Sequence, residues 1–134
     1  MKNDVILNKI NVIERCVKRV KEEYDNNPEN LQNITKQDSI ILNLQRACEA
    51  SIDLAMHIVI EKKIGLPQNS LDAFTLLETA YILPSSIVQK MKFLVGFRNI
   101  AVYDFQETNL STLQRLVEDH LIDFMEYTRS LLLY

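Results

Sequence analysis

The chain has 134 residues, of which 47% are hydrophobic, and a formal net charge of −3. This length is typical of one domain, so we predict a single domain over residues 1–134 that is large enough to bury a hydrophobic core. The acidic balance argues against a surface that coats nucleic acid in general, although one local basic patch is compatible with it. Only two glycines and three prolines are present, which favours a few long helices joined by short turns.

Hydropathy and cysteine usage predict a cytoplasmic protein that does not enter a membrane. No apolar run reaches the ~20 residues that span a bilayer, and the N-terminus leads into an amphipathic segment rather than a signal peptide. Cys16 and Cys48 lie within helical patterns without metal-ligand spacing. We interpret them as buried free thiols, which fits a reducing compartment.

The first predicted helix covers residues 5–24 and is followed by turn-rich residues 25–30. Its apolar residues recur at intervals of four and three, which places them on one face: Ile6, Ile10, Ile13, Val17, Val20 and Tyr24. Arg15, Lys18, Arg19 and Lys21 gather in its second half. We interpret them as a solvent-exposed face with basic residues near the helix C-terminus, and the alternative is a rim that attracts phosphate.

The second predicted helix is long, over residues 36–63, with Thr35 or Asp38 as its N-cap. Glu49, Asp53 and His57 follow one another at intervals of four, so they share one side of this helix. We interpret the row as surface ion pairs and hydrogen bonds, in which Glu49 or Asp53 could orient an arginine from an adjacent helix. The sequence has no second ligand cluster, so no metal site is predicted.

Three shorter helices complete the predicted bundle. Gly65-Leu66-Pro67 ends the second helix, and a third begins at Ser70 or Asp72 and carries Tyr81. A fourth runs from about residue 86, after Pro84, into an apolar motif, with these residues facing inward: Ile87, Met91, Leu94, Val95 and Ile100. The last starts at about residue 111 and carries His120 on its apolar stripe. We expect this histidine to be partly buried and hydrogen-bonded. Because His57 is the only other histidine, His120 is also a candidate for a general base.

The motif at residues 93–105, FLVGFRNIAVYDF, carries one charged side chain, Arg98, into apolar surroundings. A guanidinium keeps its charge, so a half-buried Arg98 needs an anionic partner or an anionic ligand. Gly96 in a helical run indicates a close approach of another backbone. From the residues alone, the simplest interpretation is a helix end in which Arg98 pairs with Asp53 or Asp104 and the aromatic side chains pack.

This motif resembles the signature of the HepT-like proteins, the toxin half of HEPN/MNT toxin–antitoxin pairs. Other stretches also look like landmarks of that family: Asn43-Leu44-Gln45, the run from Ala50 to His57, Gly65-Leu66-Pro67 and Ala73-Phe74. The resemblance therefore covers nearly the whole chain. It implies an all-α, up-and-down bundle of four to five helices that forms a homodimer, an RNA substrate, a minimal nucleotidyltransferase antitoxin as partner, and no cofactor.

The family pattern R-x-x-x-x-H-x-Y is altered in this chain. Arg98 and Asn99 match it, but Tyr103 occupies the histidine position and Phe105 the tyrosine position. The resemblance implies a metal-independent endoribonuclease in which Arg98 binds the scissile phosphate and Asn99 orients it. A phenol with a pKa near 10 is a poor base at neutral pH, so we expect cleavage to be weakened or lost.

The second alteration concerns modification by the antitoxin. The resemblance implies that the motif's tyrosine accepts a nucleotide that the antitoxin transfers. Phe105 has no hydroxyl to accept it, and Tyr103 could be a shifted acceptor. On an ideal helix, positions 98 and 103 point about 140° apart, so either the helix ends between them or two protomers compose the site.

Two functions other than that of a ribonuclease toxin are also compatible with the sequence. The first is a non-catalytic interaction or substrate subunit of a minimal nucleotidyltransferase, and the second is a domain that binds nucleotide or phosphate without RNA.

Overall fold

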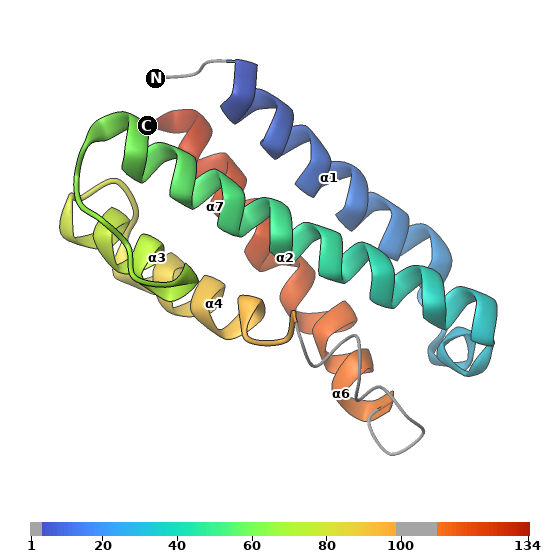
Figure 1. Cartoon of the computed structure of the whole chain (residues 1–134). Coiled ribbons are helices and arrows are strands. Elements are labelled where there is room, and N and C mark those ends of the chain that lie inside the picture. The colour runs from blue at the N-terminus through green and yellow to red at the C-terminus, as the bar shows by residue number, and fades with distance from the viewer. Residues whose placement is uncertain (1–3, 99–109) are drawn as a thin grey trace.

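A computed structural model describes residues 4–98 and 110–134, and within them the chain is helical, with no strand. The helices are α1 (Asp4–Tyr24), α2 (Ile34–Lys62), α3 (Ser70–Thr79), α4 (Ser85–Val95), α6 (Leu110–Arg115) and α7 (Leu121–Leu133). A short 3₁₀ helix, η1 (Pro28–Gln32), precedes α2, and a π-helical turn, η3 (Leu116–His120), joins α6 to α7. The predicted all-α bundle is confirmed (Figure 1).

The long helices α1 and α2 form one side of the bundle and pack against each other along most of their length (Figure 1). Every residue of the predicted α1 stripe is buried. Each such side chain contributes about 1.5–3 kcal/mol through burial, so the intervals of four and three in the sequence are sufficient to orient this helix. No helix in the described part of the chain has the length and apolar character needed to cross a bilayer.

Asparagine side chains cap three of the helical segments. Asn33 Oδ1 accepts a hydrogen bond from the Lys36 backbone N–H at the start of α2, and Asn69 Oδ1 accepts one from Asp72 at the start of α3. Asn27 does the same for η1. The prediction that Thr35 or Asp38 caps the second helix is wrong, because the helix already begins at Ile34 and the extended residue before it is Asn33.

The connection between α3 and α4 differs from the sequence prediction. Tyr81 was expected on the third helix, but α3 ends at Thr79 and Tyr81 has a φ of +59° and is 91% exposed. The next two residues, Ile82 and Leu83, are buried, and both of their N–H groups donate to the Leu77 carbonyl. The chain therefore turns back at Tyr81 to bury these two side chains, which leaves Tyr81 in the left-handed region.

Tyr127 of α7 contacts α2 and α3 at the centre of the bundle. Its side chain is fully buried, its hydroxyl donates to the Ser51 carbonyl of α2 at 2.8 Å, and its ring lies 5.7 Å from that of Phe74 of α3. The predicted single helix from residue 111 is wrong in one respect, because the π-helical turn η3 interrupts it. An extra residue in that turn keeps Leu113 before it and Leu121 after it both buried.

Candidate functional site

Arg98 lies in a tight turn directly after α4, not within the helix. The helix ends at Val95, and the N–H groups of Phe97 and Arg98 donate to the carbonyls of Leu94 and Val95, three residues back. The predicted continuation of the helix through Arg98 is therefore wrong. Gly96 has an ordinary helical φ of −62°. Among the described residues, a Cβ there would meet only the carbonyls of Lys92 and Phe93 at the end of α4 itself, so no other described element approaches this glycine.

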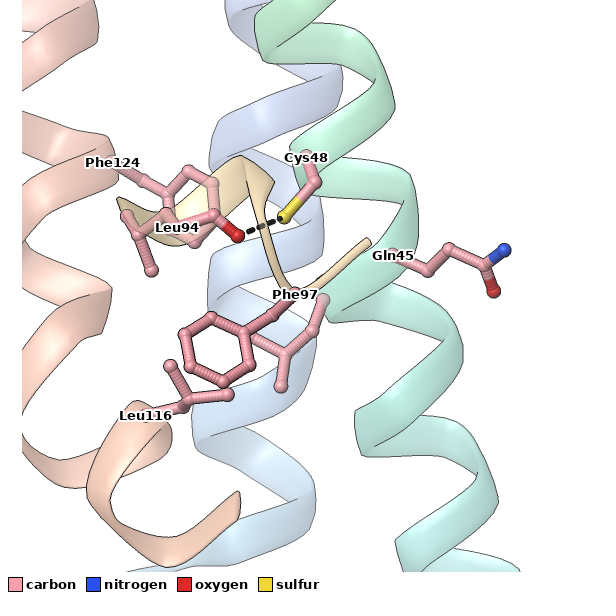
Figure 2. Close-up of a pocket in the computed structure, with 7 residues that line it drawn as sticks. Gln45, Cys48, Leu94, Phe97, Leu116 and Phe124 are labelled. Atoms are coloured by element: carbon pink, nitrogen blue, oxygen red, sulfur yellow. Dashed lines mark hydrogen bonds between the residues drawn. The ribbon is translucent and has the colours of Figure 1, made fainter. Parts of the chain in front are cut away.

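The turn before Arg98 is held against α2 by packing and by one thiol. Figure 2 shows Cys48 Sγ pointing at the Leu94 carbonyl, to which it donates at 3.5 Å, and the ring of Phe97 beside Leu116. The cavity that these residues line has a volume of only about 10 Å³, so it has no room for a ligand. Burial, then the neighbouring Glu49 carboxylate, raise the pKa of Cys48 to about 12, while Arg98 opposes the shift. Both cysteines are buried free thiols, as predicted.

The guanidinium of Arg98 reaches α2 and forms an ion pair with Glu49. Nε lies 3.3 Å from Oε1, and the two side chains are 28% and 49% exposed. The predicted pair of Arg98 with Asp53 is wrong, because Asp53 instead pairs with Lys9 of α1 at 3.5 Å. An ion pair with this exposure contributes about 0–1 kcal/mol, so a phosphate group can replace Glu49 as the partner of Arg98 at little cost.

The row of Glu49, Asp53 and His57 is split among different partners. His57 Nε2 lies 2.9 Å from Glu61 Oε2 one turn further along α2. In residues 4–98 and 110–134, no three His, Cys, Asp or Glu side chains gather in a way that could hold a metal ion. The prediction that these three residues form surface ion pairs and hydrogen bonds is confirmed.

An open groove of about 360 Å³ runs between α1 and α2 beside the Arg98–Glu49 pair. Its polar lining comprises Lys9, Gln45, Arg46, Glu49 and Asp53. The exposed side chain of Arg46 adds a cation one helical turn from Glu49. Positive charge is therefore available along the α2 face next to Arg98. The role of Lys9 was not predicted from the sequence.

The basic residues of α1 lie on its outer surface. Arg19 pairs with Glu22 at 3.6 Å and Glu23 at 3.0 Å, as expected for a solvent-exposed face. Arg15 and Lys18 are exposed and border a separate shallow groove with Asn8, Asn11 and Glu14.

Several residues of the motif lie outside the described residues: Asn99, Ile100, Ala101, Val102, Tyr103, Asp104 and Phe105. This also applies to the predicted pairing of Arg98 with Asp104. Within the motif, the described part of the site therefore comprises the turn that ends in Arg98.

A second polar cluster lies on the other flank of α4, around His120. His120 Nδ1 is 3.0 Å from Asp123 Oδ2, with the histidine 27% exposed and the aspartate 5% exposed. The prediction of a partly buried, hydrogen-bonded histidine is confirmed. Its partner Asp123 was not predicted, although the three-residue spacing of His120 and Asp123 on a helix is the signal that could have identified it.

Comparison with known proteins shows which class of protein this fold and this motif define. The chain belongs to the Ribonuclease HepT-like family, which matches residues 12–131. It is 46% identical over 125 residues to the mRNA nuclease HepT of Shewanella oneidensis, an alignment that covers 93% of this chain and 94% of that relative. The membership inferred from the motif is confirmed.

Solved structures of toxin–antitoxin complexes share the fold. The tri-AMPylated HEPN toxin of S. oneidensis in complex with MNT antitoxin superimposes with a TM-score of 0.91 and 44% identity, covering 99% of this chain and 100% of that one. A crystal structure of a toxin–antitoxin with AMP-PNP gives the same TM-score and identity, over 98% of this chain and 100% of the other.

Proposed function

We propose that this protein is the toxin of a HEPN/MNT toxin–antitoxin pair: a homodimeric, single-domain, cytoplasmic endoribonuclease that cleaves RNA without a metal ion and is held in check by a minimal nucleotidyltransferase. The observation that carries the proposal is Arg98. It is the arginine of the family motif, its guanidinium is partly exposed at the end of α4, and its carboxylate partner is weakly held. The similarity to an mRNA nuclease over 93% of the chain supports the same assignment.

The proposed chemistry assigns separate roles to the motif residues. Cleavage requires a cation close to the phosphorane as negative charge develops, and Arg98 supplies it by exchanging Glu49 for the scissile phosphate. Asn99 orients that phosphate through its amide. Tyr103 donates a hydrogen bond to the phosphate or stacks on a base, but it is a poor proton acceptor at neutral pH. Cleavage is therefore weaker than in a relative that retains the motif histidine.

The second candidate function is a non-catalytic subunit that binds the nucleotidyltransferase as an interaction partner or as its substrate. The observation that favours it is the double departure at Tyr103 and Phe105. Phe105 offers no hydroxyl for nucleotide transfer, so in this case Tyr103 is the acceptor within the motif.

Cleavage of a labelled single-stranded RNA in the presence of a chelator tests the proposal. The proteins compared are the wild type, Arg98→Ala and Arg129→Ala, the last being an exposed arginine of α7 that serves as the matched control. We expect the wild type and Arg129→Ala to cleave and Arg98→Ala to be slower by about 10²–10³-fold.

A Tyr103→His variant separates the two candidate functions. If it cleaves RNA much faster than the wild type, the nuclease site is intact except for its base. If neither protein cleaves RNA although both fold, the nuclease assignment is wrong and the non-catalytic subunit is the better interpretation.

A further inference from the structure

The cluster around His120 has the arrangement of a histidine that accepts protons. Asp123 is almost fully buried and its carboxylate holds the Nδ1 side of the ring at 3.0 Å. The carboxylate can accept a hydrogen bond from Nδ1–H, and this arrangement leaves Nε2 as the ring nitrogen that can accept a proton. Among the residues that the structure describes, none forms a hydrogen bond with Nε2, and the ring is open to solvent on one side.

The charges that face this pair come from two helices. Lys90 of α4 lies 4.0 Å from the second oxygen of Asp123 and 3.1 Å from Glu126 of α7. These contacts hold the two carboxylates in place. The orientation of His120 is therefore built into the packing of α4 against α7.

The π-helical turn sets the direction of the imidazole. His120 is its last residue, with φ −118° and ψ −5°, which departs from the helical values on either side. Single π-helical turns are frequent at functional sites, because the extra residue re-aims a side chain while the flanking residues keep their packing. Here Leu113 before the turn and Leu121 after it are buried, and His120 turns toward α4.

An aromatic row connects His120 with the turn that carries Arg98. The His120 ring lies 5.1 Å from the Phe93 ring, and the Phe93 ring lies 5.0 Å from that of Phe97, the residue before Arg98. Phe93 is half-exposed, so a base of single-stranded RNA can stack on it. A nucleotide stacked on Phe93 would lie beside the His120 ring.

We propose that His120, oriented by Asp123, is the general base of RNA cleavage in this chain, in the place of the histidine that Tyr103 replaces. The inference rests on the proposed ribonuclease function. His120 Nε2 takes the proton of the ribose 2′-hydroxyl, and the 2′-oxygen forms a bond to phosphorus while the bond from phosphorus to the 5′-oxygen breaks. The leaving 5′-oxygen takes a proton from water, the product is a 2′,3′-cyclic phosphate, and His120 returns its proton to solvent.

The other groups of the chain are less suited to this role. The chain has only two histidines, and the second, His57, faces Glu61 on the exposed side of α2. The phenol of Tyr127 is fully buried, and that of Tyr24 donates to Glu118. His120 is thus the imidazole with a buried carboxylate behind it and an aromatic surface beside it, the pairing that proton-accepting histidines use.

The test compares the wild type, His120→Gln, Asp123→Asn and the matched control His57→Gln on single-stranded RNA in chelator, with each rate measured from pH 5 to pH 9. We expect His120→Gln to lower kcat by about 100-fold or more with little change in KM, and to remove the rise of rate with pH that a histidine base produces. His57→Gln should match the wild type. In His120→Ala, added imidazole should restore part of the rate, an effect that a purely structural role of His120 would not produce.

The outcomes separate the general-base role of His120 from the ribonuclease assignment on which it rests. If the wild type cleaves and His120→Gln keeps its rate and pH profile, the general-base role is wrong and the nuclease assignment stands. If only Tyr103→His cleaves, His120 does not supply the base, although the nuclease scaffold is intact. If no variant cleaves, the nuclease assignment itself is wrong. If His120→Gln unfolds, imidazole rescue and the wild-type pH profile still decide the role.

Discussion

Replacing Tyr127 by phenylalanine should remove one buried hydrogen bond and leave the packing of α7 intact. The hydroxyl donates to the Ser51 carbonyl at 2.8 Å, and the ring that remains keeps its contact with Phe74. A neutral buried hydrogen bond contributes about 1 kcal/mol net to the free energy of unfolding. With an unfolding entropy of roughly 2.1 cal/mol/K per residue over 134 residues, that loss lowers Tm by about 4 °C.

The pH dependence of the same variant follows from the pKa of the buried phenol. Burial raises the pKa of Tyr127 well above the value of about 10 that it has in the unfolded chain. Below pH 10 the phenol is neutral in both states, and its contribution to stability is complete. Above pH 10 only the unfolded state loses the proton, so wild-type stability falls by about 1.4 kcal/mol per pH unit from this group. Phenylalanine does not titrate, so the deficit of the variant should vanish near pH 11.

Urea unfolding followed by circular dichroism at pH 8 and between pH 9 and 11, at equal protein concentration, measures both effects. Burial and the adjoining Glu118 raise the pKa of Tyr24 to about 12, but Tyr24 is present in both proteins and its titration cancels in the difference. Tyr81→Phe is the matched control, because that side chain is exposed, and its stability should equal that of the wild type. A deficit that stays constant up to pH 11, or no deficit at pH 8, would refute the reasoning.

Three further predictions concern the site and the turns that support it. Glu49→Gln should change the free energy of unfolding by less than about 1 kcal/mol. It should also tighten binding to an uncleavable 2′-deoxy strand by up to about fivefold, because Arg98 no longer has to give up an ion pair to reach a phosphate; weaker binding in fluorescence anisotropy contradicts this. Gly65→Ala should cost about 1–3 kcal/mol in urea unfolding, since φ is +153° and the new Cβ would lie 2.8 Å from Leu76; equal stability would show that this turn relaxes. Cys48 should resist a thiol reagent at pH 8 until the protein unfolds, because burial raises its pKa to about 12, and rapid labelling of the native protein would argue against the packing around α4.

The sequence by itself determined the fold class and most of the core. The intervals of four and three in α1 and the shortage of glycine and proline are properties of the chain alone, and burial of one apolar face per helix follows from them. The motif around Arg98 was sufficient to indicate the HepT-like family. The spacing of Glu49 and Asp53 also placed two of the candidate partners of Arg98 on one face of α2.

Only the tertiary structure decided how these parts meet. Periodicity does not say which of two equivalent carboxylates an arginine will reach, and the approach of α1 to α2 assigns Asp53 to Lys9 and leaves Glu49 to Arg98. The left-handed turn at Tyr81 arises because the next two residues, Ile82 and Leu83, are buried against the bundle, and the sequence pattern does not show this. The π-helical turn that aims His120 at Phe93 has the same origin: packing of α7 against α4 outweighs the local preference for a regular helix, and no residue pattern announces it.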